Sequence, residues 1–545
     1  MNIRIPDLVS VYYTDGDGKN LVWQKDNGEG ERALSFGSGE LGFSLDNGAL
    51  TVSATARCGG IRFIKLRFLG RMRRAVRVLG DAYERAYGDL LWQPVCPEKT
   101  MPWYIAVSNG SDSDTDYRDR FTECFGVKVC PNAICFWQYD SEGVTLWLDA
   151  RCGGEGVRLG GRSLELATVL FREYREISAY SALCAFAKEM CPEPYLPDHK
   201  VYGSNNWYYA YGKSSHAEII EDSRLLAELC RGNENAPYMV IDDGWQPNPT
   251  DAPWDIGNER FPDMKGLADS MRALGVRPGI WVRFLVNGHK GERRIEVPES
   301  WYIQKRKTTF DPSHPEVLDY VAKITDVLTR LWGYELIKHD FSTFDIFGRW
   351  GTAMTDAICD DGWSFFDKTK TTAEIIKNFY KTIKDNANGA VIIGCNCIGH
   401  LCATYHQLNR TGDDTSGRRW SQTVRMGVNS LAYRGCQNGA FYMADADCVG
   451  ITGQIPWEYN REWLKALSVS GTPMFVSCKP GVLGEGELAE LREAYRVASY
   501  QADSLVPLDW METATPEEYL LNGERVRFSW YGREGSTSFD EKLGQ

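Results

Sequence analysis

The regular alternation of short apolar runs with helical segments after residue 200 constrains the fold of this chain more than any other feature. Eight runs have the length and composition of buried strands, at residues 201–207, 238–242, 279–284, 334–340, 391–395, 403–408, 440–444 and 473–477. Helical patterns follow most of them, at residues 216–230, 264–274, 316–332, 372–386, 421–433, 461–469 and 485–499. Eight such units over about 300 residues are typical of a (β/α)8 barrel, whose active sites lie at the carboxyl ends of the strands. The fifth and sixth runs leave no room for a helix between them, so we expect one of these two strand assignments to be wrong.

The first 195 residues follow a different pattern. Short alternating runs are separated by Gly, Asn and Asp turns, for example at residues 20–23, 41–45, 61–64, 133–137 and 143–148. This pattern predicts an antiparallel β-sandwich. A helical segment at 178–190 and the proline-rich stretch 191–197 then mark a boundary.

The chain of 545 residues is longer than the about 250–300 residues over which one core can grow. We therefore predict an α/β protein of three parts. These are an N-terminal antiparallel β-sandwich at 1–195, a catalytic (β/α)8 TIM barrel at 196–500 and a small C-terminal β segment at 501–545. The run Val526–Tyr531 is the basis for the last part.

The charge and composition of the chain narrow the classes of partner that it can bind. A formal net charge of −13 argues against nucleic acid, because neutralising phosphates needs an excess of Lys and Arg on one face. A neutral small molecule fits better, and the 18 Trp and 27 Tyr residues suit a sugar. The sequence has no run of roughly 18 apolar residues and no apolar signal-peptide core, so we expect a cytoplasmic protein without a membrane partner. The 16 scattered Cys residues fit reduced thiols.

The run 334–341 includes Lys338, His339 and Asp340 at its end, and we expect all three at the solvent-exposed rim of the barrel. Lys338 and Asp340 are two residues apart and so lie on the same side of the strand. A Lys beside a carboxylate keeps it ionised, as a nucleophile must be. Asp340 is therefore the candidate nucleophile and Lys338 a candidate substrate-binding residue. The alternative is a plain ion pair between them.

The second run ends in Asp242-Asp243-Gly-Trp245. Two adjacent carboxylates at a rim repel each other, and a ligand that offers hydroxyl donors would relieve this. An aromatic ring beside them suits a pyranose, so all three residues are predicted to bind sugar. The alternative is a solvated Asp-Asp turn. The ends of the first and third runs add Trp207 and Arg283 to the predicted sugar-binding residues.

After the sixth run comes Arg410-Thr-Gly-Asp413-Asp414, in which the glycine permits a sharp turn. Arg410 can hold a sugar hydroxyl. One of the two carboxyl groups can act as general acid if burial keeps it protonated while Asp340 stays charged. The alternative is an ordinary Asp-rich turn.

Two further residues are predicted to contribute to the pocket. Asp447 follows the seventh run, and we expect it either to contact the sugar or to support the residues that do. Cys395 ends the fifth run and is expected in the pocket as a reduced thiol. A competing interpretation is a zinc site made by Cys395, Cys397, His400, Cys402 and His406. Paired C-x2-C hairpins are absent, so we predict no metal and no cofactor. A serine hydrolase is not indicated, because the chain lacks Gly-x-Ser-x-Gly.

The segment Tyr238–Trp245, Tyr-Met-Val-Ile-Asp-Asp-Gly-Trp, is followed by Trp254, by Arg-Phe-Pro-Asp-Met-Lys-Gly-Leu at 260–267 and by Gly-Val-Arg-Pro-Gly-Ile-Trp at 275–281. In this series the chain resembles the clan D glycoside hydrolases, and among them the melibiase-type α-galactosidases. The resemblance covers about 201–480 and, more loosely, the preceding sandwich. The chain departs from the family at His339, where Trp is usual, and at 394–399, where the family has a Cys followed by a Gly-rich Arg turn. The segment 412–416 also resembles the related α-glucosidase-type motif.

The resemblance implies roles for particular residues. Asp242 and Asp243 would bind O4 and O6 of the sugar, Asp340 would be the nucleophile, and the lysine two residues before it would bind the sugar. The segment 410–414 resembles the acid/base motif. Asp413, the first carboxylate after the small residue, is the favoured proton donor, and Asp414 is the alternative.

We therefore expect a retaining exo-α-glycosidase that releases terminal α-linked galactose, or another galacto-configured sugar, by double displacement. The nucleophile and the proton donor would then lie about 5–5.5 Å apart. The alternatives are an α-galactosyl transglycosylase, an α-glycosidase of other sugar specificity, a zinc-dependent hydrolase and a non-enzymatic sugar-binding barrel. The predicted partner is an α-galactoside or a related oligosaccharide. The sequence leaves the oligomeric state open, a homo-oligomer included.

Overall fold

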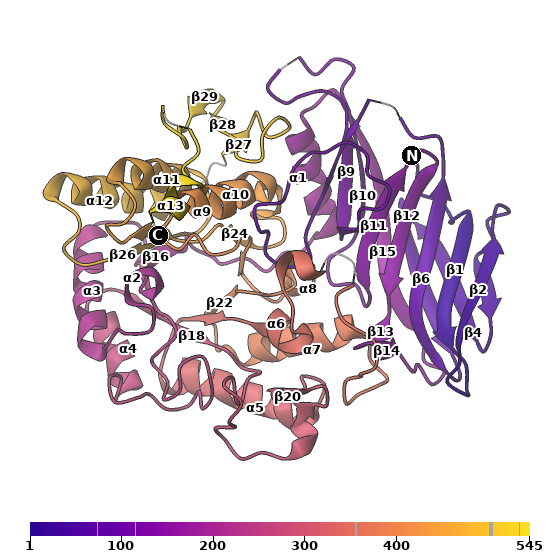
Figure 1. Cartoon of the computed structure of the whole chain (residues 1–545), viewed down its shortest axis with the longest axis horizontal. Helices are drawn as coiled ribbons and strands as arrows, with labels where there is room; N and C mark the ends of the chain where they lie inside the picture. Colours follow the sequence, from indigo (N-terminus) through magenta and orange to yellow (C-terminus); the bar gives the residue numbers. More distant parts are fainter. Residues whose placement is uncertain (74, 115, 355–356, 501–504, 534, 545) are drawn as a thin grey trace.

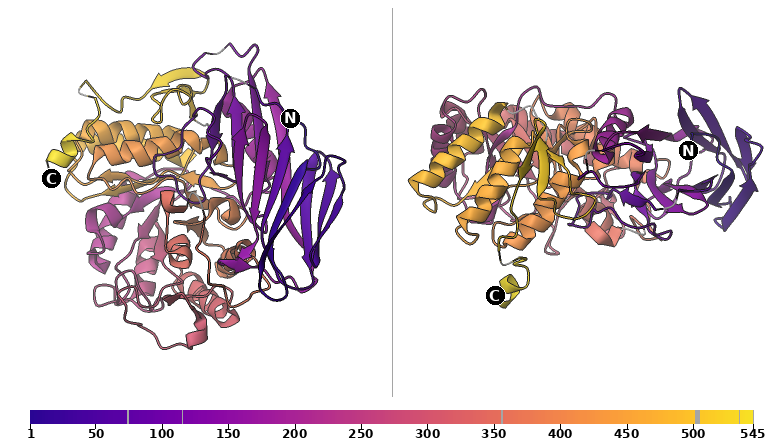
Figure 2. Two further views of the ribbon diagram at one scale, coloured as in Figure 1. Left: turned by 45° about the vertical axis from the view of Figure 1, so that its right-hand side comes forward. Right: turned by 90° about the horizontal axis from the view of Figure 1, so that it is seen from above.

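The structure, a computed structural model, has a large antiparallel β part packed beside a β/α part (Figure 1). It describes residues 1–545 except 74, 115, 355–356, 501–504, 534 and 545. The N-terminal strands form one end of an elongated molecule, as the right-hand view of Figure 2 shows. The predicted boundary between residues 500 and 501 falls at 501–504, outside the described residues. The rest of the predicted division of the chain stays a prediction.

Two antiparallel sheets make up the N-terminal part. One has the strand order β2 (Asn20–Asp26), β1 (Leu8–Thr14), β6 (Gly60–Leu69), β12 (Gly143–Asp149), β11 (Ile134–Asp140) and β8 (Met101–Pro102). The other has the order β3 (Ala33–Phe36), β4 (Gly39–Asp46), β5 (Ala49–Ala56), β15 (Leu164–Arg175), β10 (Phe121–Val127), β9 (Tyr104–Ser108) and β7 (Arg77–Gly80). In β5 buried and half-buried residues alternate, as period-two patterning predicts. The buried faces meet in a shared core, where the ring centroids of Phe68 in the first sheet and Phe171 in the second lie 4.9 Å apart.

The second part is built on a nine-stranded parallel sheet. Its order is β24 (Met443–Asp445), β23 (Leu408–Arg410), β22 (Val391–Gly394), β21 (Leu336–His339), β18 (Arg277–Val282), β17 (Tyr238–Ile241), β16 (Tyr202–Asn205), β26 (Met474–Cys478) and β25 (Val449–Ile451). The end strands β24 and β25 are consecutive in the chain and are separated only by residues 446–448. The two ends of the sheet therefore meet, and β24 and β25 together fill one position of an eight-position barrel.

Helices cover the outside of this sheet (Figure 1). The predicted helices are present as α3 (His216–Leu229), α4 (Met264–Ala273), α5 (Pro315–Asp326), α7 (Thr372–Asn386), α11 (Trp457–Val469) and α12 (Glu485–Tyr500). The predicted helix at 421–433 consists of α9 (Trp420–Thr423), a π-helical turn (Val424–Val428) and α10 (Asn429–Tyr433). Local sequence sets the start of α7, because Thr371 and Glu374 form a reciprocal capping box there.

The predicted sixth strand at 403–408 is wrong except for its last residue. After β22 the chain makes a single helical turn, α8 (Gly399–Cys402), and the sixth strand is β23, which begins at Leu408. Ala403 and His406 are buried although they lie outside any strand. A short apolar run therefore marks burial here rather than strand structure, an ambiguity that periodicity cannot resolve. The first predicted strand is also shorter than expected, because Trp207 begins the short helix α2 (Trp207–Ala210).

The chain ends in the small sheet that the sequence predicts, with the strand order β27 (Val506–Pro507), β28 (Glu518–Leu521) and β29 (Glu524–Arg527). It lies over the helices α9 to α11 at the top of Figure 1. Trp530 joins the two, because its indole N–H and that of Trp420 donate to the carbonyls of Pro516 and Trp530, respectively. All sixteen cysteines are free thiols. Among the described residues, no helix has the length and apolar character needed to cross a membrane.

Candidate active site

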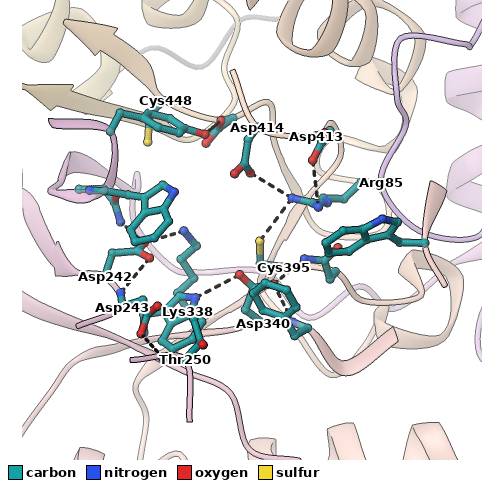
Figure 3. A pocket seen from close by; sticks show the side chains of 18 of the residues that line it. Arg85, Asp242, Asp243, Thr250, Lys338, Asp340, Cys395, Asp413, Asp414 and Cys448 are labelled. Atoms are coloured by element: carbon teal, nitrogen blue, oxygen red, sulfur yellow. Dashed lines mark hydrogen bonds and ion pairs between the residues drawn. The ribbon is translucent and has the colours of Figure 1, made fainter. Parts of the chain in front are cut away.

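A pocket of about 350 Å³ opens at the carboxyl ends of the barrel strands, where barrel active sites lie. Nine of the twelve residues predicted to form the site line it: Trp207, Asp242, Asp243, Lys338, Asp340, Cys395, Asp413, Asp414 and Asp447. Figure 3 shows most of these side chains around one open space. The strand ends that the sequence indicated are therefore brought together in one cavity.

Asp340 follows β21 directly and is held by three donors. The indole Nε1 of Trp281 donates to Oδ2 at 3.1 Å, and the amide Nδ2 of Asn396 donates to Oδ1 at 2.6 Å. The backbone N–H of Phe341 also donates to Oδ1, at 2.6 Å. Phe341 has a φ of 62°, a left-handed conformation that is rare for a bulky residue. This turn aims the Phe341 N–H at the carboxylate, so the backbone itself fixes the orientation of Asp340.

Lys338 pairs with Asp242 and not with Asp340 as the sequence suggested. Its ammonium lies 2.7 Å from Oδ2 of Asp242, which also accepts from Asn205 Nδ2 at 2.7 Å. Burial lowers the pKa of Lys338, but Asp242, with smaller contributions from Cys395 and Asp340, raises it overall, so the lysine stays charged. Lys338 and Asp340 do share one side of the strand, because both line the pocket.

Asp243 is a buried carboxylate that accepts two hydrogen bonds from its own loop. Its Oδ1 accepts from Gln246 Nε2 at 2.5 Å and from the Thr250 N–H at 2.8 Å. Burial raises its pKa to about 6 in spite of these donors. A carboxylate in this position gains from a ligand hydroxyl that replaces lost water, as the sequence analysis expected of this pair.

The other end of the pocket holds the carboxylates Asp413 and Asp414 around a buried arginine, Arg85. Arg85 Nη2 lies 3.0 Å from Asp413 Oδ1, and its Nη1 donates to Asp414 Oδ1 at 3.1 Å. Arg410 Nη2 donates to the same Asp414 oxygen at 3.2 Å. Arg85 comes from the segment between β7 and β8, so the β-sandwich part of the chain contributes a charged group to a pocket in the barrel.

The Arg85 segment is joined to the barrel loop by backbone hydrogen bonds. The Ala86 N–H donates to the Thr411 carbonyl at 2.8 Å, and the Asp413 N–H donates to the Ala86 carbonyl at 2.9 Å. Arg434 strengthens the contact, since its buried guanidinium donates to Asp81 Oδ1 at 2.8 Å and to the Thr411 carbonyl at 3.0 Å. The position of Arg85 against the two carboxylates is thus set by main-chain pairing.

Position and acidity distinguish Asp413 from Asp414. Asp414 is 39% exposed against 23% for Asp413, and Figure 3 shows its carboxylate directed into the open space on the side of Asp340. Burial raises the pKa of Asp413 against the influence of Arg85. At Asp414 burial acts in the same direction, but Arg410 and Arg85 outweigh it and hold the pKa below its usual range. Asp413 therefore takes a proton more readily, whereas Asp414 is the better placed.

Asp447 is buried, and groups of the protein itself occupy most of its carboxylate. Its carboxylate accepts from the Thr415 N–H at 2.8 Å and from the Thr415 hydroxyl at 3.0 Å, and it pairs with Arg410 Nη1 at 3.0 Å. Tyr208 donates a further hydrogen bond to it. Asp447 thus orients Arg410 and the loop of Asp414 while one part of it lines the pocket.

Three predicted sugar-binding residues do not line the pocket. Trp245 is fully buried, and its indole N–H donates to the Trp281 carbonyl at 2.9 Å. Arg283 is buried and pairs with Asp345 at 2.6 Å. Arg410 is buried behind Asp414 and Asp447. Residue type and strand position could not indicate these outcomes, because each side chain is engaged by other protein groups that spacing along a strand does not reveal.

His339 was expected at the rim but is fully buried. It points away from the pocket, as strand alternation requires when its two neighbours point inward. Its ring packs against Phe284, Phe379, Tyr380 and His406. Burial lowers its pKa to about 3, so His339 is neutral and adds no charge beneath Asp340.

The sequence analysis missed several residues of the pocket wall. These are Arg85, Tyr87, Trp281, Phe341, Trp350 and Asn396, among others. Trp281 could have been found, because it lies near the end of the third predicted strand. Arg85 and Tyr87 carry no such signal, since they lie in a loop of the other part of the chain. Three of the five competing zinc ligands are dispersed: Cys395 faces the pocket, while His400 Nε2 bonds the Val127 carbonyl at 2.9 Å and Cys402 Sγ the Gly399 carbonyl at 3.3 Å.

Solved structures of α-galactosidases share this architecture. The α-galactosidase TtGalA from Thermus thermophilus is 15% identical, with a TM-score of 0.58, over 91% of this chain and 98% of its own. The GH36 α-galactosidase AgaA from Geobacillus stearothermophilus is 13% identical, with a TM-score of 0.58, over 93% of this chain and 77% of its own. The galactosidase domain of the α-galactosidase-sucrose kinase AgaSK is 14% identical, with a TM-score of 0.57, over 91% and 74%.

No protein-family model and no curated protein matches the sequence. The solved structures alone confirm, at the level of the fold, the resemblance to clan D α-galactosidases that the motifs indicate. At such low identity the shared property is the arrangement of the chain, and the chemistry has to be argued from the pocket.

Proposed function

We propose that this chain is a retaining exo-α-glycosidase that releases terminal galactose, or another galacto-configured sugar, from α-galactosides. The observation that carries the proposal is the pairing of Asp340, oriented by three hydrogen-bond donors, with a second carboxylate, Asp414, across a small pocket. Two carboxyl groups on opposite sides of a glycosidic bond are what glycoside hydrolysis needs.

In the proposed reaction Asp340 attacks the anomeric carbon as the glycosidic bond breaks. The leaving oxygen takes a proton from the acid, and a β-linked glycosyl-enzyme forms. The residue that gave up this proton is now a carboxylate and removes a proton from water. The water attacks the anomeric carbon and releases Asp340. The two inversions together retain the α configuration of the product.

For the proton donor we favour Asp414 over Asp413. A general acid must first be within reach of the leaving oxygen, and only then does its acidity matter. Asp414 is the more exposed to the pocket and faces Asp340, which supports this choice. Arg85 and Arg410 lower its pKa, and a bound sugar that excludes water would alter the balance of burial and charge on which this pKa depends.

The sugar would bind at the end of the pocket formed by Asp242, Asp243 and Lys338. Carboxylates accept hydroxyl protons and an ammonium donates to hydroxyl oxygens, so a hydroxyl-rich ring satisfies this end. Support for galactose comes from the similar structures, since TtGalA was solved with p-nitrophenyl α-D-galactopyranoside and with stachyose. The pocket volume of about 350 Å³ suits one sugar ring with part of its aglycone.

A panel of nitrophenyl α-glycosides tests the proposal, with the galactoside, the N-acetylgalactosaminide and the glucoside as members. We expect the galactoside to be cleaved with the highest kcat/KM. Proton NMR of the first product should show the α-anomer before mutarotation. Release of the β-anomer would rule out retention, and no turnover of any member would rule out the glycosidase assignment. Products larger than the donor would identify transfer to a second sugar.

A further inference from the structure

Three soft donor groups, those of His339, Cys397 and His406, meet in the protein interior behind Asp340. His339 ends β21, Cys397 lies in the turn between β22 and α8, and His406 lies two residues before the start of β23. Their ligand atoms all lie within 4.8 Å of one another, and all three side chains are buried. They do not line the pocket. The cluster is therefore a separate feature from the candidate active site, and it differs from the ligand set that the sequence suggested.

The distances in the cluster are close to those around a tetrahedral metal ion. His339 Nε2 lies 3.0 Å from His406 Nε2 and 3.5 Å from Cys397 Sγ. Zinc bonds of about 2.0–2.1 Å to nitrogen and 2.3 Å to sulfur separate two nitrogens by about 3.3 Å and a nitrogen from a sulfur by about 3.6 Å. Cys397 Sγ also lies 3.8 Å from His339 Nδ1, so a rotation of the His339 ring would be needed to turn its Nε2 toward the sulfur and place all three groups around one ion.

We propose that His339, Cys397 and His406 form a structural zinc site behind the nucleophile. Two imidazoles and a thiolate are typical ligands of this ion. The proposal is independent of the glycosidase assignment, because no step of the proposed reaction involves the ion. Binding would convert the Cys397 thiol to a thiolate and release its proton to solvent, with no change of oxidation state.

The surroundings of His406 support this use of its Nε2 atom. Within the described part of the chain, His406 Nδ1 and Asn409 Oδ1 are both buried without a hydrogen-bond partner. A Cβ placed on Gly394 would lie 2.7 Å from each, so both atoms border the same small space. A rotation of the His406 ring or of the Asn409 amide would let an Nδ1–H donate to this free acceptor, which leaves the Nε2 lone pair for a metal. Ligating histidines commonly use their second ring nitrogen in this way.

The ion would join three successive elements of the barrel. Cys397 is adjacent to Asn396, whose amide orients Asp340, and His339 is adjacent to Asp340 itself. The Ser342 hydroxyl lies 3.5 Å from Cys397 Sγ and can hydrogen-bond the sulfur. Loss of the ion should therefore lower the free energy of unfolding and loosen the nucleophile, without removing a reacting group.

The metal content of the full-length protein tests the site directly. The wild type is produced in medium with zinc, purified without chelator and analysed by mass spectrometry for metals. We expect about one zinc ion per chain, held through dialysis because the ligands are buried. Cys397→Ser should lose the ion. Cys402→Ser is the matched control, since Cys402 is an equally buried thiol nearby that bonds the Gly399 carbonyl.

Protein produced with cobalt in place of zinc gives a second readout that needs no variant. Tetrahedral Co²⁺ bound by a thiolate should give visible ligand-field bands and a near-ultraviolet charge-transfer band. Wild-type protein that contains no stoichiometric zinc and shows no such bands would overturn the proposal. Retention of zinc by Cys397→Ser would overturn the ligand set. Neither result depends on activity, so the outcome is separate from that of the glycoside panel.

Discussion

The end of the pocket that holds Asp242, Asp243 and Lys338, the sugar end, is made by the barrel strands β17 and β21. The end that holds Asp413 and Asp414, the acid end, is shared between a barrel loop and the Arg85 segment of the sandwich part. At the sugar end one lysine faces one carboxylate. At the acid end two arginines surround two carboxylates. In the proposed reaction the barrel alone would bind the sugar, whereas the acidity of the proton donor would depend on both parts of the chain.

Asp340 lies between the two ends, and its replacement should have the largest effect. Asp340→Asn keeps the shape of the side chain and removes the nucleophile, so kcat should fall by about 10⁴-fold or more. Steady-state kinetics measure the loss, and calorimetry with galactose measures the binding that should remain. Turnover near that of the wild type would exclude Asp340 as the nucleophile.

Asparagine variants of the two neighbouring carboxylates test the acid end. Asp414→Asn should lose about 10²–10⁴-fold in kcat/KM on an oligosaccharide such as stachyose, whose leaving group needs a proton. The loss should be smaller on a nitrophenyl galactoside, whose leaving group does not. Azide should restore turnover of the nitrophenyl galactoside by Asp414→Asn, because azide attacks the glycosyl-enzyme without a base.

Asp413→Asn is the matched comparison for that experiment. It should show a similar loss on both substrates and no rescue by azide. If the two patterns were exchanged, Asp413 would be the proton donor, in agreement with the order of residues that the sequence favoured.

Arg85→Met should separate the contribution of the sandwich part from that of the barrel. Loss of this cation raises the pKa of Asp414, because Arg85 helps to hold it low. A general acid works while it is protonated, so the alkaline limb of the kcat/KM profile should move to higher pH. The exposed Arg77 on β7 supplies the control, Arg77→Met. An unchanged profile in Arg85→Met would show that the sandwich part does not tune the acid.

Asp243→Asn should have the smallest effect on the architecture and a measurable effect on stability. Asparagine keeps the oxygen that accepts from Gln246 and Thr250. Folding raises the pKa of Asp243 from 3.8 to about 6, so the folded state binds more protons than the unfolded state between these values. The free energy of unfolding therefore falls as pH rises through this window, and the variant should lack that component.

Urea unfolding at several pH values between 4 and 7 measures this difference. Relative to pH 4, the variant should gain about 1–3 kcal/mol over the wild type at pH 7. The exposed Asp119 provides the control Asp119→Asn, which should follow the wild type. Equal pH slopes in all three proteins would show that Asp243 is not desolvated. Binding of galactosides should weaken in Asp243→Asn alone.

The sequence predicted those parts of the site in which residue position along a strand decides side-chain direction. Asp242, Asp243, Lys338 and Asp340 all follow or end short apolar runs, and all line the pocket. The rule failed for Trp245, which follows a glycine with φ of 110° and turns into the core. Once the chain leaves the strand, the direction of a side chain depends on the turn and on packing partners, which spacing does not reveal.

The alternation of strands and helices, and with it the barrel, follows from local properties of the chain, namely hydrophobic periodicity and capping. The sequence also places carboxylates at several strand ends, and parallel strands bring such ends to one rim. Which groups meet at that rim depends on how the chain packs. Arg85 reaches Asp414 through the pairing of Ala86 with a distant loop, and His339 meets Cys397 and His406 behind the rim. Such contacts join residues far apart in the chain, so they exist only after the core has packed.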